Sequence, residues 1–223
     1  MQHLALTVIL EVMNIDIIYL VIIIGVILFS MTLHEAMHAF ASYWLGDDTA
    51  KLQGRLTFNP IKHIDPFLTL LLPILLAISG LPIFGGAKPV PFNPHNLRFG
   101  EWGMAIVALA GPFTNFVIAF ISFGIWVVLG MPNQDIIGQV LIGFISINLG
   151  FFVFNMIPIP PLDGSRALYI LAPEFIRRGM EYIERFGIMI IFIILLITGS
   201  ALGTFMVRAI GFFLDLFSYI FGI

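Results

Sequence analysis

Two histidines and a glutamate lie inside a long apolar stretch near the N-terminus, in the order His34-Glu35-Ala36-Met37-His38. On an α-helix, residues four positions apart lie on one face, so His34 and His38 can direct imidazole nitrogens at the same metal ion. Glu35 is then free to act as a general base. This HExxH spacing is typical of zinc hydrolases. A charged residue in a membrane span costs about 2.5–3.5 kcal/mol on insertion scales, so titratable groups placed there indicate a function.

Two alternatives to a zinc site exist for this motif. A buried histidine pair can bond to backbone carbonyl groups and bind no metal, and the motif by itself leaves that possibility open. The residues Glu35-Ala36-Met37-His38 also match the Glu-x-x-His of di-iron helical bundles. Such bundles need a second Glu-x-x-His and two further glutamates on other helices. The sequence has no second Glu-x-x-His, which excludes the di-iron site.

The composition indicates the environment in which the motif functions. The chain of 223 residues is 60% hydrophobic and 10% charged, values typical of a polytopic membrane protein. It contains no cysteine, which excludes disulfide bonds and thiolate metal ligands. The net charge of −3 gives no reason to expect a nucleic-acid partner. We expect one membrane domain over residues 1–223, with a catalytic core at about 15–172 and a C-terminal span and tail at about 185–223.

Apolar segments predict the elements that must position the motif. The expected fold class is all-α, a helical bundle of about four to six membrane spans. Spans are predicted at residues 15–45, 101–130 and 136–157, with a last span from about 185 to 202 and an amphipathic or re-entrant tail. Residues 67–94 combine a short apolar run with many prolines and glycines, which excludes a continuous helix. We expect a re-entrant segment with extended, β-like backbone there.

The distribution of Lys and Arg predicts the orientation in the membrane. Residues 1–45 and the turn at 131–135 contain neither, whereas the connections at 46–66, 80–101 and 164–185 contain several. If residues 67–87 re-enter the membrane, all basic connections fall on one side, which the positive-inside rule makes the cytoplasmic side. We therefore expect a multi-pass protein of the cell (plasma) membrane, with the HExxH end of the first span toward the cytoplasm.

A catalytic zinc site usually has three protein ligands, so a third must come from elsewhere in the chain. Asp163 is the candidate, because it follows a proline-rich stretch at the end of a span and precedes Gly164. The alternative is that Asp163 caps the helix expected to begin at Ser165. Its position at the same side of the membrane as the HExxH motif favours the ligand role.

With these two motifs the chain resembles the site-2 proteases, the zinc intramembrane protease family. The resemblance extends from residue 34 to residue 164 and rests on the HExxH motif, Gly86-Ala87-Lys88-Pro89-Val90, Ala110-Gly111-Pro112 with Asn115, and the stretch from Asn155 to Leu162-Asp163-Gly164. It implies one Zn²⁺ per chain held by His34, His38 and Asp163, with Glu35 as general base and Asn155 assisting at the active site. No PDZ-like or CBS-like module is found, so the chain is similar to the short bacterial or archaeal forms.

The resemblance implies a zinc-dependent intramembrane endopeptidase, which hydrolyses peptide bonds within or near transmembrane segments. Its role would be regulated intramembrane proteolysis or the clearance of signal-peptide remnants. The expected partners are a transmembrane or signal-peptide protein substrate and the lipid bilayer, while the oligomeric state stays open. The alternatives are a membrane zinc hydrolase acting on a non-peptide, lipid-like substrate and a metal-binding pseudoenzyme or transporter. Glu35 argues against the latter, because binding metal does not require it.

Two asparagines within the spans have more than one possible role. Asn155 can donate an N–H group to a developing oxyanion or form an interhelical hydrogen bond. The residues alone do not separate these roles, and the resemblance favours the catalytic one. For Asn115 we expect helix packing.

The predicted substrate-binding residues are Gly86, Ala87, Lys88, Pro89 and Val90. A peptide bond in a membrane helix is shielded and hydrogen-bonded, so the enzyme must offer replacement partners to the unwound backbone. Residues before proline favour extended backbone, and an extended edge can accept a peptide by strand addition. We predict that residues 86–90 bind unwound substrate beside the zinc. The alternative is a loop that only connects two spans.

Overall fold

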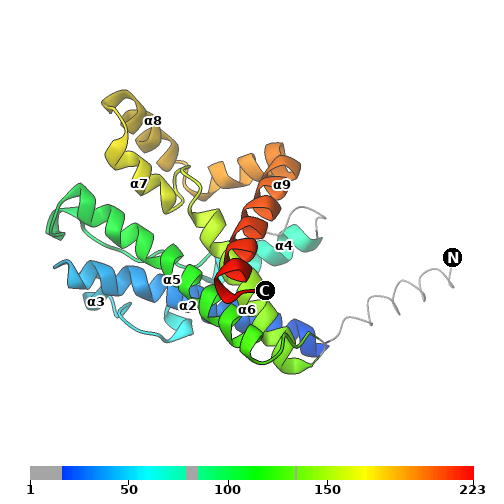
Figure 1. Ribbon diagram of the computed structural model, residues 1–223. Helices are drawn as coiled ribbons and strands as arrows, with labels where there is room; N and C mark the ends of the chain where they lie inside the picture. Colours follow the sequence, from blue (N-terminus) through cyan, green and yellow to red (C-terminus); the bar gives the residue numbers. More distant parts are fainter. Residues whose placement is uncertain (1–16, 79–84, 134) are drawn as a thin grey trace.

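The computed structural model describes residues 17–78, 85–133 and 135–223, and this part of the chain is helical without a β-strand (Figure 1). Four helices are long and apolar enough to cross a membrane: Ile17–Trp44, Glu101–Val128, Ile136–Asn155 and Met189–Phe221. The prediction of an all-α polytopic membrane protein is therefore confirmed. The helices, in chain order, are α2 (Ile17–Trp44), α3 (Thr49–Leu52), α4 (Leu72–Ile78), α5 (Glu101–Val128), α6 (Ile136–Asn155), α7 (Gly164–Leu171), α8 (Glu174–Glu184) and α9 (Ile188–Phe221).

Helices α2, α5 and α6 pack together as the three-helix core of the protein (Figure 1). The antiparallel pair α5–α6 is closed by a tight turn, in which the Trp126 indole N–H donates to the Pro132 carbonyl at 2.8 Å. The Asp135 carboxylate caps α6 by accepting from the Gly138 N–H at 2.7 Å. A Cβ at Gly138 would lie 2.4 Å from the Pro132 carbonyl oxygen, so the turn approaches α6 this closely only because residue 138 is glycine.

A buried polar chain crosses the centre of this core. The Asn115 side-chain N–H₂ of α5 donates to Asn148 Oδ1 of α6 at 2.8 Å, and Asn148 Nδ2 donates to Ser30 Oγ of α2 at 2.8 Å. All three side chains have no exposed surface. Interhelical hydrogen bonds of this kind join membrane helices where no hydrophobic effect drives them together. They set the rotation of α2 relative to α5 and α6.

Helix α9 packs its C-terminal half against the core through aromatic rings. Phe217 is fully buried, and its ring centroid lies 5.5 Å from that of Phe116, 5.1 Å from Phe120 and 5.6 Å from Phe123. The last span was predicted to end near residue 202, followed by an amphipathic or re-entrant tail, and here the structure differs. One helix continues to Phe221, because residues 203–221 remain apolar and repeat aromatic side chains every four positions toward α5.

The segment at 67–94, predicted to be re-entrant and extended, divides into two described parts. A π-helix at Pro66–Leu71 continues directly into α4, and together they are too short to cross a membrane. Residues 79–84 lie outside the described residues, as do residues 1–16, which contain the start of the first predicted span. Residues 85–93 have no regular secondary structure, so no β-strand forms in this described part of the segment. Its backbone is irregular and makes isolated hydrogen bonds.

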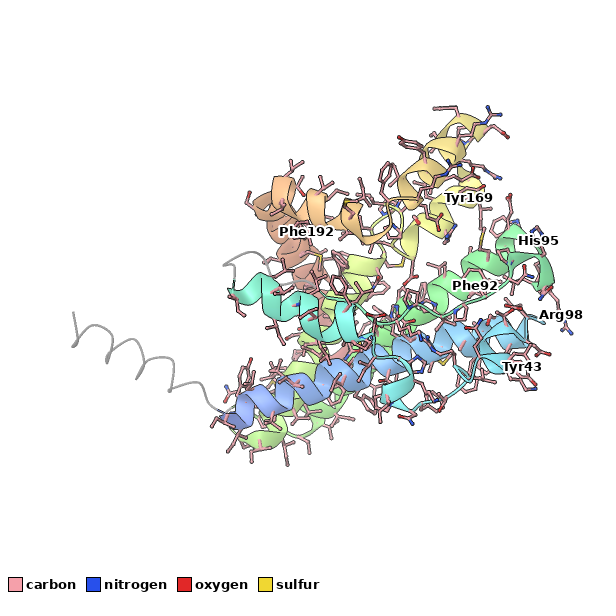
Figure 2. All side chains as sticks on the ribbon, turned by 180° about the vertical axis from the view of Figure 1, so that it is seen from behind. Tyr43, Phe92, His95, Arg98, Tyr169 and Phe192 are labelled. Atoms are coloured by element: carbon pink, nitrogen blue, oxygen red, sulfur yellow. The ribbon has the colours of Figure 1, made fainter. Side chains whose placement is uncertain are left out.

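A buried aspartate joins the loops at one end of the core. The Asp47 carboxylate accepts from Thr49 Oγ1 at 2.6 Å, from the Asn93 N–H at 2.7 Å and from Asn96 Nδ2 at 3.1 Å. Burial by itself raises the pKa of Asp47, but these hydrogen bonds outweigh burial and lower it. Tyr43, His95, Arg98 and Tyr169 lie at this same end of the molecule (Figure 2). The connection after α2 and the connection before α5 are thus held to one another.

Candidate metal centre

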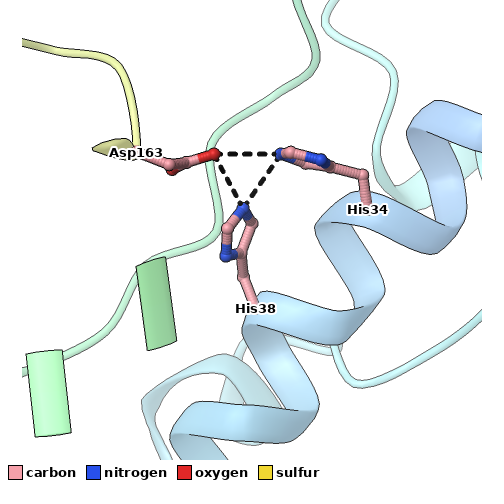
Figure 3. A group of neighbouring side chains, drawn as sticks. All are labelled: His34, His38 and Asp163. Carbon is pink, nitrogen blue, oxygen red and sulfur yellow. Dashed lines mark hydrogen bonds and ion pairs between the residues drawn. The ribbon is translucent and has the colours of Figure 1, made fainter. Parts of the chain in front are cut away.

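Three potential metal ligands converge from two distant parts of the chain (Figure 3). His34 and His38 lie one turn apart on α2, and Asp163 lies between α6 and α7. Asp163 Oδ2 is 3.2 Å from His34 Nε2 and 3.5 Å from His38 Nε2, and the two Nε2 atoms are 3.0 Å apart. Both histidines are buried, and the Asp163 side chain is 22% exposed. The three residues predicted as ligands are therefore neighbours.

The other ring nitrogen of each histidine is bonded to a fixed acceptor. His34 Nδ1 lies 2.6 Å from Asn115 Oδ1, and His38 Nδ1 lies 2.7 Å from the Val107 carbonyl oxygen. The amide of Asn115 is oriented by its own donation to Asn148, so its oxygen faces His34. Each Nδ1 therefore carries the proton and donates, which leaves the Nε2 lone pairs directed at Asp163.

This donor set fits a divalent cation. Two imidazole lone pairs and one carboxylate oxygen point at one another across 3.0–3.5 Å, an arrangement in which acceptors repel unless a cation lies among them. One proton can bridge only one pair of these atoms, whereas one metal ion attracts all three. Two nitrogens and one oxygen are a common protein ligand set of catalytic zinc, whose bonds of about 2.0–2.2 Å place tetrahedral ligands roughly 3.3 Å apart. His34, His38 and Asp163 are the residues that would hold zinc.

The turn before α7 directs Asp163 toward the histidines. Helix α6 ends at Asn155, and the proline-rich residues that follow cannot continue it. Asp163 occupies the N-cap position of α7, yet its side chain makes no capping hydrogen bond. A Cβ at Gly164 would lie 2.4 Å from the Met156 carbonyl oxygen, so the turn closes against the end of α6 only with glycine at 164. The capping alternative therefore does not describe the Asp163 side chain, which faces the two histidines.

Gly111 of α5 provides the space in which the histidine nitrogens meet. A Cβ on this residue would lie 2.3 Å from His38 Nε2 and 2.7 Å from His34 Nε2. Any side chain at 111 would therefore enter the site itself. The sequence analysis names Gly111 only as part of a family motif and does not predict this role. A glycine beside Pro112 in the middle of a predicted span was the available signal.

Asn115 packs helices, as predicted, and also bonds to His34, a role that sequence reasoning missed. The signal was a polar side chain within an apolar span, which usually has a partner. Asn155 is the last residue of α6, and its side chain donates to the Phe151 carbonyl oxygen of its own helix at 3.0 Å. Its predicted part in catalysis stays a prediction.

Glu35 is half-buried beside the two histidines and does not belong to the ligand group. Its negative charge acts on two buried residues of the connection after α2. Burial lowers the pKa of the Arg55 guanidinium, and the Glu35 charge partly opposes that shift. Burial likewise lowers the pKa of His63, where the Thr57 carbonyl and Glu35 oppose the shift and Arg55 adds to it. Arg55 and His63 therefore lie within electrostatic reach of Glu35.

The same two residues hold the predicted substrate-binding segment. The Lys88 N–H donates to the His63 carbonyl at 2.9 Å, and Arg55 Nη2 donates to the Lys88 carbonyl. Two residues earlier, the Gly86 N–H donates to the Leu68 carbonyl at 3.1 Å, and its carbonyl accepts from Thr69 Oγ1 at 2.7 Å. The segment at residues 85–90 is thus attached through Gly86 and Lys88, and Lys88 is held by the two residues on which the Glu35 charge acts.

Curated proteins of known sequence resemble the chain over most of its length. "Putative zinc metalloprotease YwhC" of Bacillus subtilis (strain 168) is 40% identical over 187 residues, which cover 81% of this chain and 80% of the relative. "Putative zinc metalloprotease Rip2" of Mycolicibacterium smegmatis is 34% identical over 199 residues, covering 87% of this chain and 73% of the relative. "Putative zinc metalloprotease MJ0611" of Methanocaldococcus jannaschii matches a shorter region, with 44% identity over 62 residues. No protein-family model and no solved structure matches the chain significantly.

Proposed function

Because the chain belongs to the site-2 protease family of zinc metalloproteases, we propose that it is an endopeptidase that hydrolyses peptide bonds within or beside transmembrane segments of protein substrates. One observation carries the proposal. The Nε2 atoms of His34 and His38 and one oxygen of Asp163 converge within 3.0–3.5 Å of one another, with Glu35 adjacent on the same helix. This arrangement combines a metal-ligand set with a spare carboxylate inside a membrane protein.

Each residue of the site has a distinct part in the proposed reaction. When bound to these ligands, zinc supplies a Lewis acid that lowers the pKa of water to about 7 and polarises a carbonyl group. Glu35 accepts the proton of the attacking water and passes it to the leaving amine, which is general acid–base catalysis. Asn155 donates its side-chain N–H to the oxyanion after a rotation away from Phe151. Asn115 and the Val107 carbonyl keep both imidazoles in the tautomer that can bind metal.

The substrate-binding part of the proposal rests on the geometry of residues 85–90. These residues have no regular secondary structure, yet their hydrogen bonds alternate along the chain as in an extended strand, where successive residues direct their N–H and C=O groups to opposite edges. Gly86 and Lys88 use one edge for bonds to Leu68, Thr69, His63 and Arg55. Within the described part of the chain, the backbone of Ala87 and Pro89 forms no hydrogen bond, so the opposite edge offers the Ala87 N–H and both carbonyls. An unwound substrate would pair with this edge, as in strand addition.

The Ala87 N–H is the donor that the open edge offers, and this makes the substrate-binding proposal testable. Ala87→Pro removes that donor without disturbing the bonds of Gly86 and Lys88. We expect it to raise KM for a helical membrane substrate while zinc content stays constant. Val90→Pro is the matched control, because it introduces a proline into the same segment and leaves the Ala87 N–H in place. Equal KM values for both variants would contradict binding at the open edge.

The orientation of the protein is part of the same proposal. The described connections that are rich in Lys and Arg lie at the end of the core where α2 ends and α5 begins, and the positive-inside rule assigns this end to the cytoplasm. Single cysteines at the exposed positions Asp48 and Asn133 of this cysteine-free chain distinguish the two sides with an impermeant thiol reagent. We expect Asn133 to react from outside the cell and Asp48 only after permeabilisation. The reverse pattern would contradict the orientation.

The decisive experiment separates metal binding from hydrolysis. Glu35→Gln removes the base but no ligand, so the variant should bind zinc like the parent and lose cleavage of a transmembrane reporter by about 10²–10⁴-fold. Asp163→Ala should lose both zinc binding and cleavage of the reporter, because it removes a ligand. A parent protein that binds zinc but cleaves no peptide reporter would favour a non-peptide substrate or a pseudoenzyme. Capture of proteins retained by Glu35→Gln in native membranes would then distinguish substrates of signalling from signal-peptide remnants.

A further inference from the structure

Helix α8 has an inner face that is fastened to the rest of the protein by polar contacts. Arg166 of α7 forms an ion pair with Glu184, and the Tyr169 hydroxyl donates to Glu181 at 2.6 Å. Arg177 donates to the Ile170 carbonyl at 2.9 Å and to Glu101, the first residue of α5, at 2.7 Å. These contacts hold α7 and α8 as a hairpin that projects from the three-helix core (Figure 1).

The outer face of α8 has a different character. Phe175 is 75% exposed, Tyr182 is 61% exposed, and Phe186 in the turn after the helix is 45% exposed. A spacing of seven residues places Phe175 and Tyr182 on one side of the helix, and Phe186 joins them through its contact with Tyr182. The rings of Tyr182 and Phe186 contact each other edge to face at 5.3 Å. The exposed Arg185 and the exposed ion pair of Arg178 with Glu174 lie beside this row, so the outer face is an aromatic stripe with a charged border.

The position of α8 brings this stripe to the boundary of the membrane. Helix α9, a candidate span, begins at Ile188, only four residues after α8 ends, and four residues reach at most about 14 Å. The ion pair of Arg177 with Glu101 holds α8 beside Trp102, which is 61% exposed at the start of α5. Trp44 at the end of α2 is 62% exposed at the same end of the core. Tryptophans at the ends of spans mark the level of the lipid headgroups.

We propose that the outer face of α8 lies in the phospholipid headgroup region, with Phe175, Tyr182 and Phe186 directed toward the acyl chains. The helix is too rich in charged residues to enter the hydrocarbon core, yet its outer face is too aromatic for bulk water. Arg178 pairs with Glu174 on the same helix at 3.0 Å, whereas Arg185 extends beside the rings toward lipid phosphates, as long basic side chains do at an interface. The occupant of this face is the bilayer surface, and a protein partner is the competing outcome.

A depth measurement tests this proposal without reference to hydrolysis. Nitroxide labels are attached to single cysteines at Phe175 or Tyr182, and at Glu174 as the matched control one residue away on the same helix. The protein is placed in nanodiscs of phosphatidylcholine with phosphatidylglycerol. We expect the ratio of oxygen to nickel-chelate accessibility to be several-fold higher at 175 and 182 than at 174. Equal ratios, with free access of the nickel chelate at all three sites, would overturn the proposal.

A second experiment without nitroxide labels tests the same proposal in case the labels disturb α8. Phe175→Trp is a conservative change, and its added emission should be quenched by lipids brominated near the glycerol end of the acyl chain. The emission of Trp44, Trp102 and Trp126 is subtracted by using the parent protein. Absence of added quenching would overturn the proposal. Label sites that exclude both oxygen and the nickel chelate would also overturn it, because they would indicate that another protein covers α8.

Discussion

Asn115 Oδ1 lies 2.6 Å from His34 Nδ1, so a buried amide on α5 orients a candidate metal ligand on α2. The amide is itself held by Asn148 on α6, which is held by Ser30 on α2. The polar chain that joins the three core helices therefore ends on the candidate metal centre. A change in how these helices pack would therefore change the orientation of the His34 imidazole.

Replacing Asn115 should weaken metal binding without removing a ligand. We expect Asn115→Ala to lower zinc affinity by about 10–100-fold, because groups that hydrogen-bond to the outer ring nitrogen of a histidine ligand have effects of that size. Competition with a chromophoric chelator measures the affinity. Thr114→Val is the matched control, because the Thr114 hydroxyl donates only to the Ala110 carbonyl of its own helix. Unchanged affinity in Asn115→Ala would show that the amide does not orient His34.

A methyl group at Gly111 should prevent metal binding. The new Cβ of Gly111→Ala would lie 2.3 Å from His38 Nε2, so the imidazole must move out of the position in which it faces Asp163. Alanine usually stabilises a helix relative to glycine by about 0.5–1 kcal/mol, so a loss of zinc would reflect the clash. Gly150→Ala is the control, because its Cβ has no neighbour within 4 Å. Parental zinc content in Gly111→Ala would contradict this account of the site.

Asn155 offers a test that separates catalysis from packing. If its side chain donates to the developing oxyanion, Asn155→Ala should lower kcat by about 10²–10³-fold while zinc content stays the same. If its only role is the bond to the Phe151 carbonyl at 3.0 Å, kcat should change little. Steady-state kinetics on a transmembrane reporter give kcat and KM separately. A kcat within a few-fold of the parent value would exclude the oxyanion role.

Arg55 should affect substrate binding through Lys88. Arg55→Met leaves the Lys88 carbonyl without its charged donor, a bond of about 1.5–3 kcal/mol, so residues 86–90 should be less well ordered. We expect KM for a membrane substrate to rise about tenfold or more with zinc retained, and Arg55→Lys to recover part of the loss. Lys62→Met, an exposed cation in the same connection, is the control. If KM is the same in Arg55→Met and Lys62→Met, Arg55 does not position the segment.

His63 should make this region less stable at acidic pH. Burial lowers its pKa below the usual 6.5, and its Nδ1 faces the Arg55 guanidinium at 3.4 Å. The unfolded protein therefore takes up a proton first as the pH falls below 6.5, and folding stability decreases until the pH passes the folded-state pKa. We expect the drop in Tm between pH 7.5 and pH 5.5 to be smaller in His63→Gln than in the parent. An identical drop would mean that His63 does not titrate in this range.

Local patterns predicted the long helices and the residue types of the site. Hydropathy located α2, α5 and α6 to within a few residues, because the length of an apolar run reflects the thickness of the membrane. The end of α9 was predicted wrongly although residues 203–221 remain apolar, because the contacts that hold this part against the core, such as Phe217 on Phe116 and Phe120, are made with a helix about a hundred residues earlier. Hydropathy alone contains no information about such a partner.

The sequence by itself determined that His34, Glu35 and His38 share one helical neighbourhood, because helical rotation and rise depend only on local backbone geometry. It also predicted Asp163 as the third ligand, because this residue follows a proline-rich stretch at the end of a span. Only the tertiary structure decided that Gly111 leaves space for the histidine nitrogens, that Asn115 orients His34, and that Arg55 reaches Lys88. These relationships depend on the rotation and depth at which helices and loops pack, and side-chain packing between distant segments sets those quantities, not the periodicity of any one segment.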